Sequence, residues 1–295
     1  MELKITDLTK TFQNFNAVDG ISHTFGNGVY GLLGVNGAGK TTLMRMLCTL
    51  MKPSSGSITC NGQDIFQMDG DYRKLLGYLP QEFGYYPDFT VENYLQYIAS
   101  IKGLRPAVAK QRIDVLLHQV GLTKARKKKM KKLSGGMKRR AGIAQAMLNN
   151  PKILILDEPT AGLDPNERVR FRNLLSELSQ DRLVLLSTHI VSDVEYIADD
   201  ILLMKDGKIV RSGTAQSLIA TMPETVWRCQ VPRGAVELFV NTCKVANVKT
   251  VPAGAELRIV SSQKPTEDAV AEPATLEDVF LSYFGEKGGG DNGQI

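Results

Sequence analysis

The sequence predicts an α/β fold with a parallel-sheet core, an antiparallel β subdomain, a helical insertion and a small C-terminal α/β domain. Three observations favour it. Short apolar segments separated by Gly and Asn turns fill residues 3–25. Strand and helix patterns alternate from Gly28 onward, as in parallel α/β units. Residues from about 92 to 150 show only helical periodicity.

The individual elements follow from these patterns in chain order. The antiparallel layer is expected at 3–12 and 18–25, and the core opens with a strand at 29–33 and a helix at 39–50. The core resumes after the helical insertion, where we expect a strand at 152–156, a helix after Pro165, a strand at 183–187, a helix through Ile197, and strands at 201–204 and 208–212.

The character of the sequence changes after residue 221, which predicts a main domain of residues 1–221 and a small domain of residues 222–285. The small domain is expected to contain strands at 226–231, 245–251 and 257–260 and a helix at 276–284. The Gly-rich, polar residues 286–295 predict a disordered tail.

Composition excludes several classes of protein. With 43% hydrophobic and 23% charged residues, the chain is expected to fold as an ordinary globular protein. No apolar run approaches the roughly 20 residues that span a bilayer, and the N-terminus has no secretory pattern, so a cytoplasmic location is expected. The four cysteines form no CxxC pair, which argues against a zinc site or a disulfide framework.

The positive charge of the chain is local. Seven of the nine residues from Lys124 to Lys132 are Lys or Arg, and without them the formal net charge of +5 would become −2. A solvated face is the favoured interpretation, with lipid headgroups or an acidic partner as the alternative. No aromatic side chains interleave with these charges, so nucleic acid is not an expected partner.

The strongest motif is a glycine loop between a predicted strand and a predicted helix. Its sequence is GVNGAGKTT, from Gly34 to Thr42, which matches GxxxxGK[ST] and predicts a P-loop NTPase core. Backbone N–H groups around Asn36, Gly37 and Gly39 are expected to converge on phosphate oxygens. Lys40 would contact the β- and γ-phosphates, Thr41 would ligate Mg²⁺ and Thr42 would reach the α-phosphate. The alternative is a plain glycine turn with a surface lysine.

A second motif places two carboxylates at the end of an apolar strand. The segment KILILDEPT delivers Asp157 and Glu158 to the edge where open α/β sheets bind ligands. Asp157 suits Mg²⁺, and Glu158 suits polarising the attacking water. Taken alone, the pair could instead cap the next helix.

A third motif separates this chain from other P-loop NTPases. The segment LSGGMKRR opens a predicted helix with Ser134, Gly135 and Gly136, which form a second phosphate cradle. Because one chain cannot easily apply both cradles to one nucleotide, we expect ATP to lie between the glycine loop of one subunit and this segment of another. The prediction is a head-to-tail dimer with two sites.

Taken together, these motifs resemble those of ABC ATPases over about residues 1–220, and LSGGM resembles their signature motif. The resemblance implies that Gln81, in LPQ, is the Q-loop residue near Mg²⁺, and that Asp164, in AGLD, lies at the dimer seam. His189, in STH, would hydrogen-bond the γ-phosphate. Phe12, or less favourably Phe15, would stack on adenine. Met137 replaces a common Gln, which leaves helix capping intact.

The GGMKRR form of the signature and the late segment ATLEDVFLSYFG are similar to bacterial exporter ATPases for drugs, antibiotics, lipids or polysaccharides. This resemblance implies ATP and Mg²⁺ as cofactors and a separate membrane permease as partner, at the cytoplasmic face of the membrane. Residues 84–101, with Tyr85 and Tyr86, would form the groove for that partner, although core packing explains the aromatics equally well.

Two other functions stay open from the sequence. One is an ABC ATPase without a membrane partner that acts on nucleic acid or ribosomes. Its known members usually carry two cassettes, a long coiled-coil insertion or cysteine-rich sites, none of which is seen in this sequence. The other is an antibiotic-sensing immunity module with little net transport. The cargo is not determined.

Overall fold

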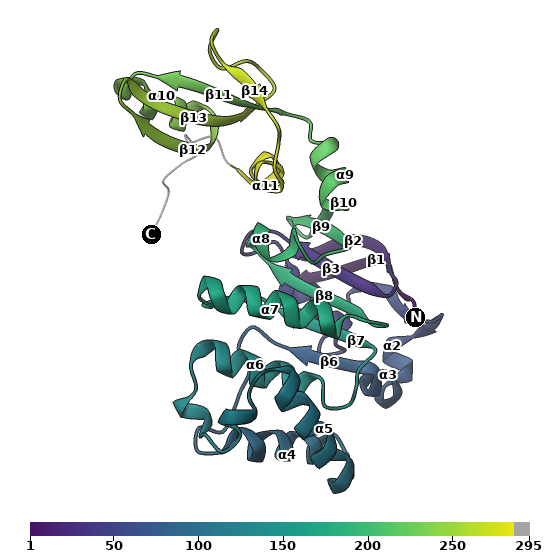
Figure 1. Ribbon diagram of the computed structural model, residues 1–295. Helices are drawn as coiled ribbons and strands as arrows, with labels where there is room; N and C mark the ends of the chain where they lie inside the picture. The colour runs from purple at the N-terminus through teal and green to yellow at the C-terminus, as the bar shows by residue number, and fades with distance from the viewer. Residues whose placement is uncertain (286–295) are drawn as a thin grey trace. The chain divides into compact units, whose positions relative to one another are not determined.

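The computed structural model describes residues 1–285 and divides into two compact units, residues 1–210 and the part from Arg211 onward (Figure 1). The sequence placed this boundary after residue 221. The structure divides earlier because α9 (Ala215–Ala220) packs against α11 (Leu276–Phe284) and so belongs to the second unit. The predicted tail, 286–295, lies outside the described residues.

The first unit contains the expected antiparallel sheet. Its order is β2-β1-β4-β5, and β1 pairs with both β2 and β4 in antiparallel register. Alternate positions of β1 are buried, which is the pattern of a strand with one face on the core. The strands are β1 (Leu3–Phe12), β2 (Phe15–Phe25), β4 (Ser55–Cys60) and β5 (Gln63–Asp64).

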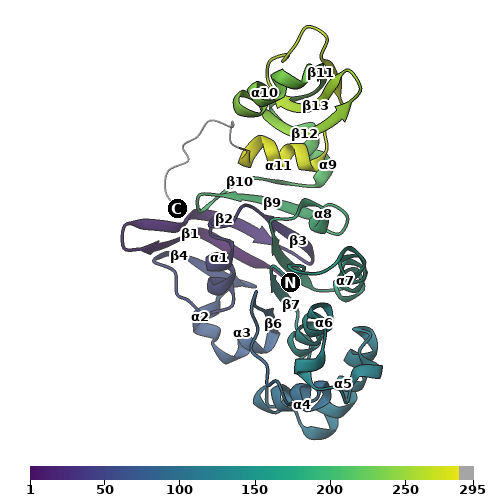
Figure 2. The ribbon, with the colours of Figure 1, turned by 90° about the vertical axis from the view of Figure 1, so that its left-hand side faces the viewer.

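A second sheet of six strands forms the α/β core, in the order β10-β9-β3-β8-β7-β6 (Figure 2). Its inner strands pair in parallel, β9 to β3, β3 to β8, β8 to β7 and β7 to β6, as predicted. The strands are β3 (Gly28–Leu33), β6 (Leu76–Leu79), β7 (Ile153–Asp157), β8 (Leu183–Thr188), β9 (Asp200–Lys205) and β10 (Lys208–Gly213).

One apolar core joins the two sheets of this unit. Buried side chains of β1, β2 and β4 pack with those of β7, β8 and β9 and with α1 (Lys40–Leu47). Every residue of β7 and β8 is buried, which explains why both strands read as continuous apolar runs. The other helices around the core are α2 (Ile65–Met68), α3 (Gly70–Leu75), α7 (Pro165–Leu178) and α8 (Val191–Val194).

The helical insertion forms as predicted. Figure 1 shows α4, α5 and α6 grouped together, and all three pack against one another while α6 also contacts β6. Thr90 caps α4 and Pro106 starts α5, so local sequence sets both helix starts. The elements are α4 (Val91–Ile101), α5 (Pro106–Gln119), the 3₁₀ turns η1 (Thr123–Ala125) and η2 (Met130–Lys132), and α6 (Gly135–Ala146).

Two predicted helices are shorter than expected. The helix predicted at 39–50 ends at Leu47, because Thr49 adopts a left-handed backbone with φ 57°. The helix expected to run through Ile197 ends at Val194, where the N–H of Ile197 bonds to the carbonyl of Val194 in a tighter turn. The elements between Ser55 and Leu79, each of two to six residues, were not predicted.

The second unit is a four-stranded antiparallel sheet, ordered β12-β13-β11-β14, with α10 and α11. The three predicted strands and the last helix are present, whereas α9, α10 and β14 were not predicted. Its elements after α9 are β11 (Thr225–Val231), η3 (Arg233–Ala235), α10 (Val236–Thr242), β12 (Lys244–Val251), β13 (Gly254–Ser261), β14 (Val270–Glu272) and α11. In residues 1–285 no helix combines the length and apolar character needed to cross a membrane.

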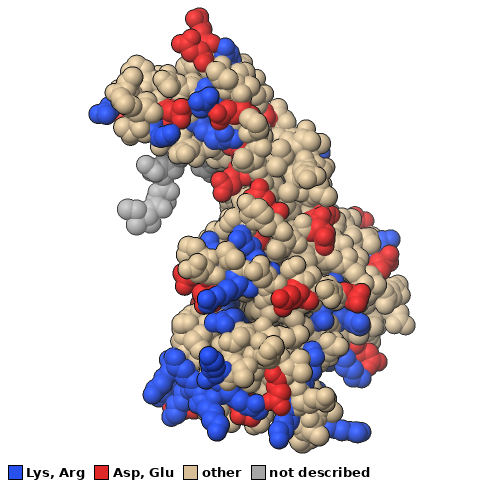
Figure 3. Space-filling view, viewed as in Figure 1, with Lys and Arg blue, Asp and Glu red and all other residues tan. Residues whose placement is uncertain are grey.

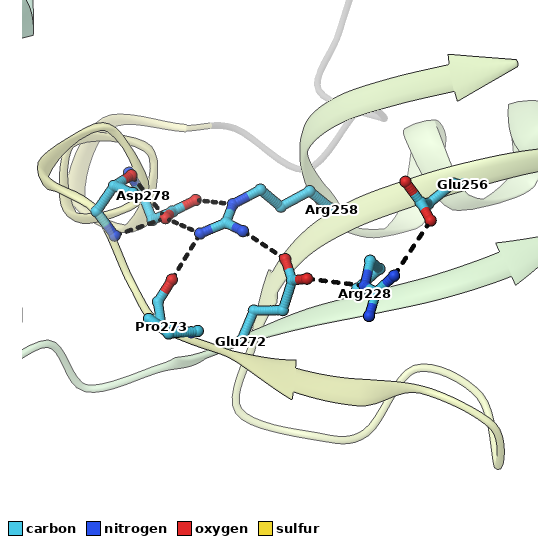
Figure 4. A network of polar contacts seen from close by, with 7 residues as sticks. Arg228, Glu256, Arg258, Glu272, Pro273 and Asp278 are labelled. Carbon is cyan, nitrogen blue, oxygen red and sulfur yellow. Dashed lines mark hydrogen bonds and ion pairs between the residues drawn. The ribbon is translucent and has the colours of Figure 1, made fainter.

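An ion-pair network inside the second unit joins three of its strands to α11 (Figure 4). Arg258 Nη2 lies 2.7 Å from Asp278 Oδ2, and Arg258 Nη1 lies 2.6 Å from Glu272 Oε2. Arg228 Nε lies 2.7 Å from the other oxygen of Glu272. Asp278 also completes a capping box with Thr275 at the start of α11. The C-terminal helix is therefore held to the sheet by the ion pair of half-buried Arg258 with buried Asp278.

Candidate nucleotide-binding site

A cavity of about 470 Å³ lies in the first unit between the end of β7, the glycine loop and the turn between β1 and β2. The sequence predicted most of its lining. The lining residues are Phe12, Phe15, Ala17, Asn36, Gly37, Ala38, Gly39, Lys40, Thr41, Thr42, Gln81 and Glu158. Three motifs far apart in the sequence, the glycine loop, Gln81 and Glu158, therefore reach one space.

The backbone of the glycine loop requires its glycines. Gly39 has φ 100°, and a Cβ there would lie 2.1 Å from the carbonyl oxygen of Ala17. Gly37 has φ 83° with open space where a Cβ would project. Helix α1 begins at Lys40, so its first N–H groups have no acceptor within the helix. These groups can bind an anion, and the helix dipole adds to that attraction.

Lys40 is held by its own loop and by a carboxylate. Its Nζ atom donates to the carbonyl oxygens of Gly34, at 2.7 Å, and Val35, at 3.0 Å. It also lies 3.5 Å from Oε1 of Glu158. Burial lowers the pKa of Lys40, and the neighbouring carboxylates of Glu158 and Asp157 oppose that shift.

Asp157 is fixed by a serine on the adjacent strand. Ser187 is the register partner of Asp157 in the β7–β8 pair, and its Oγ donates to Asp157 Oδ1 at 2.6 Å. The same Oγ accepts from the N–H of Glu158 at 3.0 Å. Asp157 is 1% exposed, and its second oxygen, Oδ2, has no hydrogen-bond partner within residues 1–285. That buried oxygen is therefore free to accept a hydrogen bond or to bind a cation.

Glu158 follows β7 in a left-handed backbone conformation, with φ 45°. Such a conformation is uncommon outside glycine and turns this side chain away from the path of Asp157. Its Oε2 lies 3.1 Å from Nδ1 of His189, which follows β8. Glu158 is 5% exposed, so the carboxylate is enclosed between a lysine and a histidine.

Several residues that hold this site were not predicted from the sequence. Ser187 had no predicted role, although a serine at the end of the strand next to Asp157 was a usable signal. Arg139 of α6 was also missed; its Nη1 donates to the carbonyl of Pro80, beside Gln81, at 3.2 Å. Nothing local in the sequence pairs buried Thr160 with buried Asp193, whose carboxylate accepts from the Thr160 hydroxyl.

The structure does not bring every predicted site residue to the cavity. The predicted site residues absent from its lining are Ser134, Gly135, Gly136, Asp157, Asp164 and His189, of which Asp157 precedes Glu158 and His189 contacts it. Ser134 caps α6 by accepting a hydrogen bond from the N–H of Met137 at 3.2 Å. The helix cap is therefore intact although Met137 stands where a Gln is common, as expected. Asp164 caps α7 by accepting from the N–H of Glu167 at 2.9 Å. The signature segment and Asp164 therefore do not contribute to the cavity of their own chain.

A glycine loop at a helix N-terminus, with its lysine facing a strand-end carboxylate, defines the nucleotide site of a P-loop ATPase. The family model for the ABC transporter matches residues 18–161. The uncharacterized ABC transporter ATP-binding protein YxlF of Bacillus subtilis (strain 168) is 40% identical over 217 residues, covering 73% of this chain and 72% of that protein. The chain belongs to the family of ABC transporter ATP-binding proteins, and it is an ATP-binding ATPase subunit.

Two further comparisons extend this result. The Nod factor export ATP-binding protein I of Burkholderia thailandensis is 37% identical over 297 residues, which cover 94% of this chain and 95% of that protein. The similarity thus includes much of the second unit. The structure of cbiO1 from Clostridium perfringens, part of the ABC transporter complex cbiONQ, aligns with a TM-score of 0.67 at 29% identity over 74% of this chain and 90% of that chain.

Proposed function

We propose that this chain powers export through a separate membrane permease by binding and hydrolysing ATP in a head-to-tail dimer. The proposal depends on one observation: only some of the predicted site residues line the cavity. Lys40 and Glu158 line one cavity, whereas Ser134, the N-cap of α6, does not line it. Family membership and the similarity to an export ATP-binding protein support the transport role.

The residues around the cavity suggest how hydrolysis proceeds. The loop N–H groups and Lys40 bind the phosphates, with Thr42 at the α-phosphate. A phosphate near Lys40 competes with Glu158 for the ammonium group, which frees the carboxylate. Glu158 then accepts a proton from the attacking water while the bond between the β-bridging oxygen and the γ-phosphorus breaks. His189, beside Glu158, donates to the γ-phosphate, and inorganic phosphate and ADP leave.

Mg²⁺ fits the donors at this site. The unpartnered Oδ2 of buried Asp157 provides an acidic oxygen, and Thr41 and Gln81 add oxygen donors in the cavity lining. We assign these three residues to hold the metal when it is bound. When bound, Mg²⁺ supplies neutralisation of the phosphate charge. The hydrogen bond from Ser187 holds Asp157 in place for that contact.

The dimer would complete each site with the signature segment of a second copy. Ser134, Gly135 and Gly136 begin α6, a twelve-residue helix with Ser134 as N-cap. A Cβ at Gly136 would lie 2.7 Å from the carboxylate of Glu167 in α7, so the starts of α6 and α7 are neighbours. Asp164, at the start of α7, would therefore lie in the same dimer seam.

The groove for the permease is assigned to residues 84–101. A cavity of about 400 Å³ beside α4 is lined by Phe83, Gly84, Tyr94 and Ile98, among others. Tyr86 is 47% exposed and Tyr97 is 39% exposed, and their hydroxyl oxygens lie 3.2 Å apart. Tyr86 and Tyr97 do not line this cavity, but exposed aromatic side chains in the same segment suit an apolar helix of a partner. Docking there would hold this subunit at the cytoplasmic face of the membrane.

The proposal is tested by purifying the tagged chain from detergent-solubilised membranes of its native host and identifying co-eluting proteins by mass spectrometry. A polytopic membrane protein in equal amount is the expected result. Ribosomes or nucleic acid without a membrane protein would contradict it and favour the other class of ABC ATPase. Transport assays in vesicles with the recovered permease then distinguish export from an immunity role with little flux.

A further inference from the structure

We propose that four lysines before the signature segment bind anionic phospholipid headgroups while the subunit is docked on its permease. The lysines are Lys124, Lys127, Lys128 and Lys132, and we call them the lysine surface. Figure 3 shows the basic side chains of this region gathered at the lower left of the view, over the helical insertion. The proposal rests on the proposed function, because docking is what would bring this surface to the membrane.

Some cations of the basic segment, residues 124–132, form ion pairs with carboxylates of this chain, and others do not. Arg126 lies 2.6 Å from Glu92 Oε1 and also pairs with Asp114. Lys129 and Lys131 both pair with Asp88, at 3.2 and 2.7 Å. Hydrogen bonds from Lys131 and Lys129 lower the pKa of Asp88, so this carboxylate is charged at neutral pH. Three cations are thus matched by three carboxylates.

The four members of the lysine surface have no such partners. Each is exposed, and none takes part in an ion pair within residues 1–285. Four positive charges therefore face solvent within nine residues, while the rest of the chain outside the basic segment has a small negative balance. The charge is concentrated at one place and is accessible there.

Backbone hydrogen bonds tie the basic segment to the proposed permease groove. The N–H of Val91 donates to the carbonyl of Lys128 at 3.1 Å, and the N–H of Met130 donates to the carbonyl of Phe89 at 2.8 Å. The N–H of Lys131 also donates to the carbonyl of Pro87, at 3.0 Å. The lysine surface is therefore fixed beside residues 87–91, which lie within the segment assigned to permease docking.

The side-chain chemistry favours lipid over other anionic partners. Lysine is a compact, hydrated point charge that suits the mobile phosphates of a membrane surface, whereas geometric recognition of a carboxylate favours arginine. The single arginine of the segment, Arg126, is already paired with two carboxylates. No aromatic residue lies between Lys124 and Lys132 to stack on bases.

The test compares the whole chain with two matched triple variants. The first changes the lysine surface, as Lys124→Gln, Lys127→Gln and Lys128→Gln, and keeps Lys132, which is two residues from Ser134. The second removes the same charge elsewhere, at exposed lysines without an ion pair in the described part of the chain, as Lys4→Gln, Lys52→Gln and Lys264→Gln. Binding is measured by cosedimentation with vesicles of phosphatidylcholine that contain phosphatidylglycerol, because anionic headgroups attract polybasic segments.

We expect the first variant to bind these vesicles about 100-fold more weakly and the second to bind nearly as well as wild type, at about 1 kcal/mol per lysine. Binding should weaken with added salt and disappear on pure phosphatidylcholine. Unchanged binding of the first variant overturns the proposal, as does tighter salt-dependent binding to RNA than to vesicles. Since ATPase activity and permease co-purification are measured separately, failure here leaves the proposed function standing.

Discussion

The Nζ atom of Lys40 lies 3.5 Å from Oε1 of Glu158, and both side chains are 6% exposed. The pair joins the first turn of α1 to the end of β7, two elements more than a hundred residues apart in the chain. A buried cation and a buried carboxylate stabilise each other, because each alone would be costly to remove from water. A phosphate that attracts Lys40 would therefore change the surroundings of Glu158 directly.

This relationship predicts the behaviour of Glu158→Gln. The amide cannot accept the proton of the attacking water, so phosphate release should fall by about 10²- to 10⁴-fold. ATP binding should persist, because the glycine loop and Lys40 are unchanged, and ATP should trap a closed dimer visible by size-exclusion chromatography. The exposed Glu177→Gln serves as the matched control. Hydrolysis by Glu158→Gln at the wild-type rate would refute the assignment of the base.

Ser187→Ala tests the support of the strand-end carboxylate. The change removes the hydrogen bond to Asp157 Oδ1 and the acceptor for the N–H of Glu158. Buried groups without partners cost about 1–3 kcal/mol, so the free energy of unfolding should fall by that amount. The Mg²⁺ concentration for half-maximal ATPase activity should rise. Ser179→Ala, which removes a hydroxyl at the exposed end of α7, should change neither quantity.

The two phenylalanines beside the cavity can be distinguished by ATP affinity. Phe12 and Phe15 face each other across the turn between β1 and β2, and both line the cavity. Stacking on a base is worth about 1–3 kcal/mol, so Phe12→Ala should raise the Kd for ATP by roughly 5- to 150-fold. Phe12→Tyr should retain binding. If Phe15→Ala has the large effect and Phe12→Ala has none, the adenine assignment moves to Phe15.

The second unit should lose stability in acid through Asp278. Burial raises the pKa of this carboxyl, but hydrogen bonds from Arg258 and Thr275 outweigh burial and leave the pKa below its ordinary value of 3.8. Because the folded pKa is the lower one, the stabilisation is complete well above pH 3.8 and is lost as the pH falls through the folded pKa. Trp227, the one tryptophan of the chain, lies in this unit and reports its unfolding by fluorescence.

Variants of the same network make this prediction specific. Asp278→Asn should lower stability at pH 7 and remove much of the acid dependence, whereas the exposed neighbour Glu277→Gln should do neither. Arg258→Met should cost about 3–5 kcal/mol at pH 7, because the carboxylate of Asp278 stays buried without its cation. An acid profile of Asp278→Asn identical to that of wild type would show that another group controls the transition.

The sequence by itself determined the fold class and most of the cavity. The apolar runs of β7 and β8, the glycine loop and the helical insertion follow local rules of burial, backbone freedom and periodicity, which operate over a few residues. The same local rules predicted that Gly37, Gly39, Lys40 and Glu158 belong to the nucleotide site, and all four line the cavity. They did not predict the elements from Ser55 to Leu79, which have two to six residues each and lack the continuous apolar runs of β7 and β8.

Only the tertiary structure decided which distant groups meet. It set the 3.5 Å contact of Lys40 with Glu158 and the hydrogen bond from Ser187 to Asp157. It also set the boundary between the two units after Val210, because α9 packs on α11. It also decided which basic residues are neutralised, since the partners of Arg126 come from α4 and α5. Such pairings depend on strand order and helix docking, and these arise from burial across the whole unit, which no single motif encodes.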